Sequence, residues 1–183
     1  MVYHKQQWIK LLQIIPHNFT IFKSIIINNN IELEEKNILE YKIITLDDIK
    51  DLAEMYVETF NSEPWNDRWT IDTASKRLHQ MINVEDFCGI LAMKNNILCG
   101  MILGSKEQFF DGMMLNIKEF CVKNEMRGKG LGTEIFREFE IRMKNEGIKE
   151  IILFTSKGDY TEHFYHKQGL ETYNGLTLMG KQL

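Results

Sequence analysis

Residues 124–140, "NEMRGKGLGTEIFREFE", combine a turn almost free of side chains with positive charge and then take up helical apolar spacing. The first turn of a helix exposes unpaired N–H groups and a partial positive charge, and glycines let a ligand approach that backbone closely. The pattern therefore predicts a binding site for an anion, such as a phosphate group. The residues expected to line this site are Arg127, Gly128, Lys129, Gly130, Leu131, Gly132 and Thr133.

Three phosphate-binding motifs compete for this turn. A Walker A loop requires G-x-x-x-x-G-K-[ST] and a dinucleotide-binding turn requires G-x-G-x-x-G, whereas residues 128–132 read G-K-G-L-G. The remaining pattern is R-x-x-G-x-G, formed by Arg127, Gly130 and Gly132. The alternative without a ligand is a mobile surface turn in which glycine only supplies flexibility.

The composition limits what kind of protein carries this turn. A chain of 183 residues with a net charge of -4 suits one globular domain and argues against nucleic-acid binding as its main task. Apolar runs are interrupted well before the roughly 18 residues of a membrane span, so we expect neither a membrane helix nor a cleavable signal. The three cysteines have no metal-ligand spacing, which predicts small buried side chains in a reducing cytoplasm and no metal site.

The pattern of apolar residues predicts a mixed α/β domain over residues 41–183, preceded by an N-terminal extension of unknown role at 1–40. The expected order is β-α-α-β-β-β-α-β-α-β-β. The first half is expected to contain a strand at 41–45, helices carrying Ile49–Phe60 and Ile71–Met81, and a hairpin at 87–104 that turns at 94–96. The second half is expected to contain a strand at 113–122, a helix from Leu131 to Gly147 and a strand at 150–156. A short helix capped by Asp159 and Glu162 and ending at Gln168, and an edge strand at 177–183, complete the prediction.

The strand before the glycine turn contains a break in its alternation. Every second residue is apolar at Leu115 and Ile117, but the next residue in this alternation, Glu119, is charged. The apolar residues then continue at Phe120 and Val122, one position out of step. A slip of one residue in a period-2 pattern predicts a β-bulge near Glu119. Burial of both faces at the end of the strand is the alternative explanation.

Two sequence blocks resemble a known family. The strand "IKEFCV" followed by "RGKGLG" and a helix resembles the acetyl-CoA signature of the GNAT N-acetyltransferases, and "FYHKQGL" at 164–170 resembles that family's FYxxxGF motif. The resemblance covers roughly residues 41–183 in element order. It implies the GNAT fold, an α/β (α+β) architecture whose mixed, mostly antiparallel sheet splays between strands 4 and 5 and is flanked by helices.

The resemblance also implies roles for particular residues. Acetyl-CoA would be the cosubstrate, with its pyrophosphate on the glycine turn and its pantetheine arm beside Phe120, Cys121 and Val122. Tyr165 would contact the cofactor and act as general acid, and a phenol suits an alkyl thiolate of similar basicity. The alternative for Tyr165 is a packed helix tyrosine.

Two further residues have roles that remain open. Glu119 is the candidate base, directly or through water, and its alternative is a solvated carboxylate at the strand end. Thr155 or Ser156 would partly replace a missing contact to pantetheine, because this chain has Gly158 and Thr161 where relatives often have Asn and Ala.

The loop "FNSEPWNDRWT" is the expected acceptor site. Trp65 and Trp69 would form an aromatic wall while Glu63 and Asp67 attract a cationic amine, unless both tryptophans serve as core residues. We expect N-acetylation of a small amine by direct attack in a ternary complex, with no nucleic-acid or membrane partner and a possible homodimer through the C-terminal strands. The alternatives are acetylation of a protein N-terminus or lysine, a non-catalytic acyl-CoA-binding module, and a nucleotide-phosphate enzyme.

Overall fold

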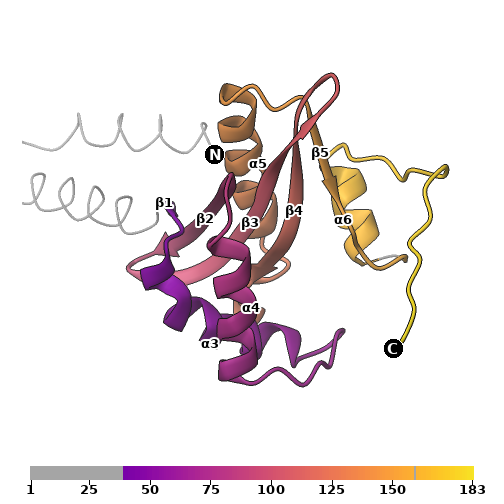
Figure 1. Ribbon diagram of the computed structural model, residues 1–183. Helices are drawn as coiled ribbons and strands as arrows, with labels where there is room; N and C mark the ends of the chain where they lie inside the picture. Colours follow the sequence, from indigo (N-terminus) through magenta and orange to yellow (C-terminus); the bar gives the residue numbers. More distant parts are fainter. Residues whose placement is uncertain (1–38, 159) are drawn as a thin grey trace, which may run out of the picture. The chain divides into compact units, whose positions relative to one another are not determined.

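The computed structural model describes residues 39–158 and 160–183 (Figure 1). The chain divides into two compact units, one formed by residues 41–93 and 98–183 and the other by residues 1–40 and 94–97. The helices and most of the sheet, which position the candidate site, belong to the first unit. Most of the predicted N-terminal extension, and the expected helix cap Asp159, lie outside the described residues.

Five strands form one mixed sheet in the order β1-β2-β3-β4-β5. β3 and β4 are antiparallel, whereas β4 and β5 are parallel and joined by a helix. The predicted hairpin is confirmed: Asn95 and Asn96 connect β2 to β3 with φ values of 53° and 61°, as a type I′ turn requires. The strands are β1 (Leu39–Ile43), β2 (Phe87–Lys94), β3 (Ile97–Phe109), β4 (Gly112–Val122) and β5 (Glu150–Leu153).

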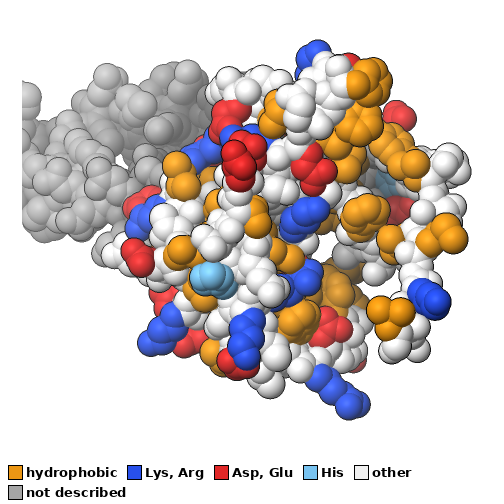
Figure 2. Space-filling view, viewed as in Figure 1, with side chains coloured by type: hydrophobic (Ala, Val, Ile, Leu, Met, Phe, Trp, Pro, Cys, Tyr) orange, Lys and Arg blue, Asp and Glu red, His pale blue; other side chains and the backbone are white. Residues whose placement is uncertain are grey.

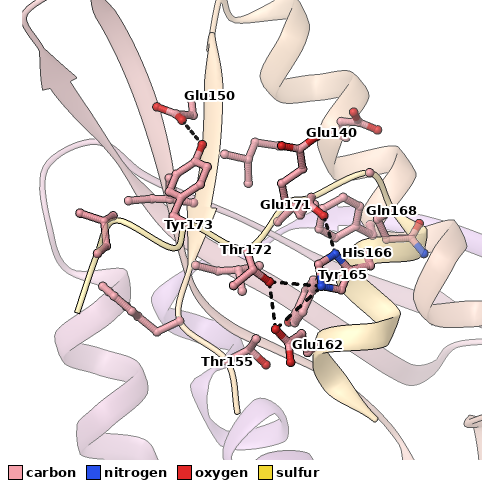
Figure 3. Close-up of a pocket in the computed structure, with 18 of the residues that line it drawn as sticks. Glu140, Glu150, Thr155, Glu162, Tyr165, His166, Gln168, Glu171, Thr172 and Tyr173 are labelled. Atoms are coloured by element: carbon pink, nitrogen blue, oxygen red, sulfur yellow. Dashed lines mark hydrogen bonds and ion pairs between the residues drawn. The ribbon is translucent and has the colours of Figure 1, made fainter. Parts of the chain in front are cut away.

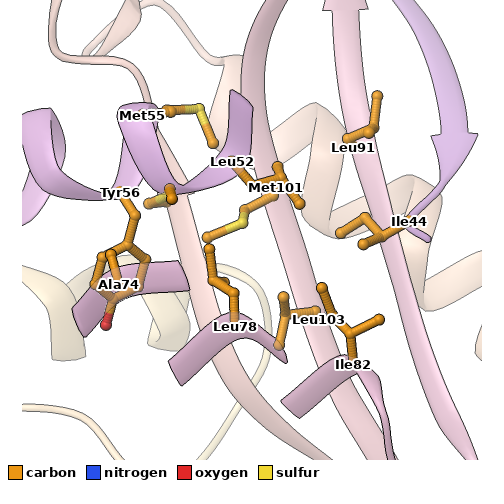
Figure 4. Close-up of a cluster of buried hydrophobic side chains, with 12 residues drawn as sticks. Ile44, Leu52, Met55, Tyr56, Ala74, Leu78, Ile82, Leu91, Met101 and Leu103 are labelled. Atoms are coloured by element: carbon orange, nitrogen blue, oxygen red, sulfur yellow. The ribbon is translucent and has the colours of Figure 1, made fainter. Parts of the chain in front are cut away.

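Helices cover both faces of this sheet. Figure 1 shows α3 and α4 in front of the sheet and α5 behind it, with α6 beside β5. Apolar residues of α3 and α4 pack on Met101, Leu103 and Cys121 to form the core of the front face (Figure 4). The helices are α3 (Ile49–Phe60), α4 (Ile71–Ile82), α5 (Leu131–Asn145) and α6 (Thr161–Lys167).

The predicted bulge in β4 is confirmed. Leu103 of β3 faces Glu119 and Gly104 faces Ile117, so Lys118 is the inserted residue. The insertion turns Glu119 toward the face that carries α3 and α4 and turns Phe120 toward α5. A Cβ at Gly104 would lie 2.3 Å from the Asn116 carbonyl oxygen, so glycine lets the two strands approach closely at the bulge.

β4 and β5 part beside this bulge. Their pairing begins at Met114 and Glu150 and ends at Ile117 and Leu153, while β4 continues to Val122. The splay expected between the fourth and fifth strands is therefore present. It leaves the last residues of β4 with one edge that β5 does not cover.

The predicted strand at 177–183 is wrong. The described part of the chain has no strand after β5, and β5 itself ends at Leu153 instead of Ser156. A strand needs a hydrogen-bonded neighbour, and apolar composition alone does not provide one. Residues 171–183 are exposed throughout, including the apolar side chains of Leu176, Leu178 and Met179. Figure 2 shows hydrophobic side chains, in orange, on the surface of the molecule.

Candidate active site

The glycine turn forms an open cradle at the start of α5. Gly128 and Gly130 have φ values of 71° and 85°, which favour glycine, and a Cβ at either position would meet no atom within 4 Å. The amide of Glu134 donates to the Gly130 carbonyl oxygen (3.1 Å), which is the first bond of the helix. The N–H groups of residues 131–133 precede that bond and therefore have no acceptor within the helix.

The third glycine of the motif serves packing. A Cβ at Gly132 would lie 3.4 Å from the ring of Phe164 and 3.6 Å from that of Phe120. The rings of Phe120 and Phe164 have centroids 5.6 Å apart, and Phe136 lies 6.4 Å from each. This aromatic cluster joins β4, α5 and α6 on the α5 side of the splay.

The two cations of the turn are both engaged by protein carbonyl groups. Arg127 donates to the carbonyl oxygens of Glu63 (3.2 Å), Thr59 (3.4 Å) and Val122 (3.4 Å), and its Cζ lies 4.8 Å from the ring centroid of Trp65. Lys129 Nζ donates to the Glu125 carbonyl oxygen at 2.7 Å. Arg127 thus links the glycine turn to the loop between α3 and α4.

Glu119 belongs to a buried polar cluster on the opposite face from α5. Its side chain is 8% exposed, and its Oε1 accepts hydrogen bonds from Tyr56 Oη (3.2 Å) and Arg77 Nε (2.8 Å) and forms an ion pair with Arg77 Nη2. Arg77 Nε also lies 3.0 Å from Tyr56 Oη. Burial raises the pKa of Glu119, while Arg77 and the Tyr56 hydrogen bond oppose that rise.

Sequence reasoning missed Tyr56 and Arg77 as site residues. A signal for Arg77 was nevertheless present, because it lies at the helical spacing of the apolar stripe formed by Ala74, Leu78 and Met81. A charged residue within such a stripe needs a buried partner. Only the fold shows that the partner is Glu119, which lies 42 residues further along the chain.

The loop between α3 and α4, predicted to bind the acceptor, divides between the two halves of the candidate site. Trp69 lies against the Glu119 cluster: its ring centroid is 5.6 Å from Arg77 Cζ, and its Nε1 donates to Asp67 Oδ2 at 3.0 Å. Trp65 instead lies beside Arg127, which also bonds the Glu63 carbonyl oxygen. Both tryptophans are half-buried, so each has a packing role and an accessible surface.

Tyr165 reaches the site from α6. Its half-buried ring packs on Phe136 and Phe164, with centroids 6.3 and 5.2 Å apart. Burial, followed by the electrostatic influence of Glu119 and of Cys121, raises the pKa of Tyr165 to about 12. The phenol therefore keeps its proton at neutral pH and lies within electrostatic reach of Glu119.

A cavity of about 770 Å³ adjoins Tyr165, between β5, α5, α6 and the C-terminal segment. Figure 3 shows Glu162, His166 and Thr172 gathered on its wall. Thr172 Oγ1 donates to Glu162 Oε1 (2.9 Å) and lies 3.2 Å from His166 Nε2, which attaches the C-terminal segment to α6. Ser156 is exposed between β5 and α6, where its carbonyl oxygen accepts a hydrogen bond from Thr161.

Cys88, Cys99 and Cys121 are buried, as predicted. Burial raises the pKa of Cys88 to about 12 and raises that of Cys121 further. Over residues 39–158 and 160–183, His, Cys, Asp and Glu side chains form no group of three or more that could hold a metal ion. No helix in that same part of the chain is long and apolar enough to cross a membrane.

A sequence model of the Acetyltransferase (GNAT) family matches residues 49–170, more than half of the chain. The chain belongs to the GNAT acetyltransferase family. The match includes the strand, glycine turn and helix that form the cradle, as well as the α6 motif with Tyr165. Members of this family are acetyltransferases that use acetyl-CoA. No curated protein sequence matches the chain.

Solved structures share this GNAT fold at low sequence identity. A possible acetyltransferase from Clostridium difficile 630 superposes with a TM-score of 0.69 at 16% identity, covering 80% of this chain and 99% of its own. An aminoglycoside acetyltransferase from an uncultured soil metagenomic sample, in complex with sisomicin, superposes with a TM-score of 0.62 at 14% identity. The match covers 79% of this chain and 96% of that structure. A predicted acetyltransferase from Clostridium acetobutylicum with acetyl-CoA superposes with a TM-score of 0.61 at 16% identity. The match covers 78% of this chain and 96% of that structure.

Proposed function

We propose that this GNAT acetyltransferase moves an acetyl group from acetyl-CoA to a primary amine of a small molecule, by direct attack in a ternary complex. The observation that carries the proposal is that Tyr165 of α6 lies within electrostatic reach of Glu119, a residue of β4, close to the point where β4 leaves β5 and the open cradle begins. An acid, a base and a phosphate cradle are the parts that such a transfer requires.

The cradle fits the pyrophosphate of acetyl-CoA. The N–H groups at the start of α5 have no helical acceptor, and the space above Gly128 and Gly130 is open. A side chain at either glycine would project into that space. The phosphate contacts would come from backbone N–H groups, because Arg127 and Lys129 are engaged by protein carbonyls.

The uncovered edge of β4 fits the pantetheine arm and the thioester. The amide of Lys123 donates to the Cys99 carbonyl oxygen in the neighbouring strand (2.9 Å). Since successive N–H groups of a strand point to opposite edges, the amides of Val122 and Phe120 point to the edge that β5 has left. The Val122 N–H is thus available to polarise a thioester carbonyl oxygen.

Acetyl-CoA supplies the activated acetyl group, and residues of this chain handle the protons. Glu119 would take a proton from the amine, directly or through water, on Oε2, because Oε1 already accepts from Tyr56 and Arg77. Tyr165 would donate its proton to the departing thiolate. Direct transfer is supported by the cysteines, since the raised pKa values of Cys88 and Cys121 keep both thiols protonated at neutral pH.

The acceptor class is inferred from charge and from one structural neighbour. Glu63 and Asp67 are exposed carboxylates in the loop beside the Glu119 cluster, which suits a cationic amine. The soil aminoglycoside acetyltransferase that shares this fold supports a small-molecule acceptor over a protein.

The test is acetylation of a pooled set of amines, read by mass spectrometry. Purified protein and acetyl-CoA would be incubated with aminoglycosides, polyamines, amino acids and short peptides, with Tyr165→Phe as a parallel sample. We expect an acetylated product from one small-molecule class and far less of it from the variant. Acetylated peptides alone would favour a protein acetyltransferase. No product from protein that binds acetyl-CoA would favour a non-catalytic acyl-CoA-binding module.

A further inference from the structure

Arg77 is held more firmly than a surface cation of a helix. Its Nε contacts both Glu119 Oε1 (2.8 Å) and Tyr56 Oη (3.0 Å), its Nη2 pairs with the same Oε1, and its Cζ lies 5.6 Å from the Trp69 ring centroid. The side chain of Arg77 is 40% exposed, whereas that of the adjacent Lys76 is 70% exposed and pairs with Asp72, one helical turn away. The two neighbouring cations of α4 therefore have different environments.

We propose that Arg77 is a positioning residue of acetyl transfer: it fixes Oε1 of Glu119, keeps this buried carboxylate ionised, and leaves Oε2 to receive the proton of the acceptor amine. This inference rests on the proposed function, in which Glu119 is the base. It adds a residue from α4, a helix outside both sequence motifs of the family resemblance.

Glu119 needs a nearby positive charge because its carboxyl group is buried. A carboxylate removed from water is driven toward its neutral form, and a neutral carboxyl group cannot act as a base. The titratable or charged groups that influence Glu119 are Tyr56 from α3, Asp67 from the loop, Arg77 from α4, Cys121 from β4 and Tyr165 from α6. Within this set of described side chains, Arg77 carries the positive charge that favours the carboxylate.

A purely structural role for Arg77 predicts a different pH dependence. If the pair only joined α4 to β4, loss of Arg77 would lower stability and lower activity by the same factor at every pH. If Arg77 keeps Glu119 ionised, its loss raises the pKa of Glu119, so activity is lost at low pH and regained at high pH. The loss must fall on the low-pH side, because a carboxylate acts as a base only above its pKa.

The experiment compares Arg77→Gln and Arg77→Lys with Lys76→Gln, which removes a charge one residue away. The 13C resonance of the Glu119 carboxyl, assigned by its loss in Glu119→Gln, would be titrated in each folded protein, and kcat/KM would be measured over the same pH range. We expect Arg77→Gln to raise both midpoints by about one to three pH units. Arg77→Lys should produce a smaller rise, and Lys76→Gln should match the wild type.

An unchanged 13C midpoint in both Arg77 variants would overturn the inference, and so would a loss of kcat/KM that is equal at all pH values. If Arg77→Gln does not fold, Arg77→Lys still decides, since a single Lys nitrogen cannot replace both the Nε and the Nη2 contact with Oε1, so the midpoint should still rise. The carboxyl titration needs no turnover. A shifted midpoint in a protein without acetyl transfer would therefore contradict the proposed function, while leaving the contact between Arg77 and Glu119 intact.

Discussion

The glycine turn and the Glu119 cluster differ in how the chain assembles them. The turn consists of consecutive residues, and the binding role proposed for it depends on backbone N–H groups at an open helix terminus. The cluster joins Tyr56, Arg77 and Glu119, and Tyr56 and Glu119 are 63 residues apart in the chain. A local site can be recognised from sequence, whereas a distributed site exists only once α3, α4 and β4 have packed together.

The two regions also differ in how they manage charge. At the turn, the cations are occupied by protein carbonyls and the helix terminus is exposed. In the cluster, a buried anion is balanced by a cation and a phenol. The first arrangement suits capture of a phosphate from water, and the second suits control of a proton.

The largest expected effect comes from Tyr165→Phe. This variant tests whether proton donation by Tyr165 can be lost without loss of CoA binding at the glycine turn. Removing the hydroxyl should lower kcat about a hundredfold or more, because the thiolate loses its proton donor. Affinity for CoA, measured by calorimetry, should remain within about threefold of the wild type. Tyr173→Phe is the matched control, since it removes an exposed hydroxyl bonded to Glu150 on the same cavity. Equal turnover in the two variants would remove Tyr165 from the mechanism.

A smaller effect is expected from Arg127→Ala, which tests whether this motif arginine serves the cofactor or the acceptor. Because its guanidinium bonds the Glu63 carbonyl oxygen and stacks on Trp65, its loss should loosen the acceptor loop. We expect the KM for the amine to rise about tenfold, the equivalent of roughly one charge-assisted hydrogen bond, with little change in CoA affinity. A larger loss of CoA affinity than of amine affinity would show that Arg127 contacts the phosphates.

The smallest effect is expected from Thr70→Ala, at the start of the helix that carries Arg77. Thr70 Oγ1 accepts the Thr73 amide at 3.1 Å and caps α4. Its loss should destabilise the protein by about 1 kcal/mol, which lowers the Tm by about 2–4 °C. The pH profile of activity should not move, since the contact between Arg77 and Glu119 remains. A changed profile would mean that α4 positions Glu119 by more than that contact.

Much of the fold follows from local patterns. The helices carry clear apolar stripes, the Asn-Asn turn specifies the hairpin, and the slip in alternation after Ile117 indicated the bulge that places Glu119. The glycine turn was visible for the same reason, since its residues are adjacent in the chain. These features depend on a few neighbouring residues and not on what packs against them.

The remaining features depend on partners that a sequence pattern does not specify. Residues 177–183 have apolar composition suited to a strand, yet in the described part of the chain they form no strand and lie exposed. Arg77 interrupts an apolar stripe, but its role follows only from Glu119 facing α4 after the bulge. Arg127 lies beside the expected phosphate site in the sequence, and the structure directs its side chain to the loop between α3 and α4.

The most direct test of the account is an acetyl-CoA titration of Gly130→Ala and Gly147→Ala. The two glycines have φ values of 85° and 82° and open surroundings, one at the start of α5 and the other just after its end, so alanine should strain each backbone by about 1–2 kcal/mol. We predict that both variants lose similar stability and that only Gly130→Ala loses affinity for acetyl-CoA, by about tenfold or more. Wild-type affinity in Gly130→Ala, or an equal loss in both, would contradict a cofactor site at the glycine turn.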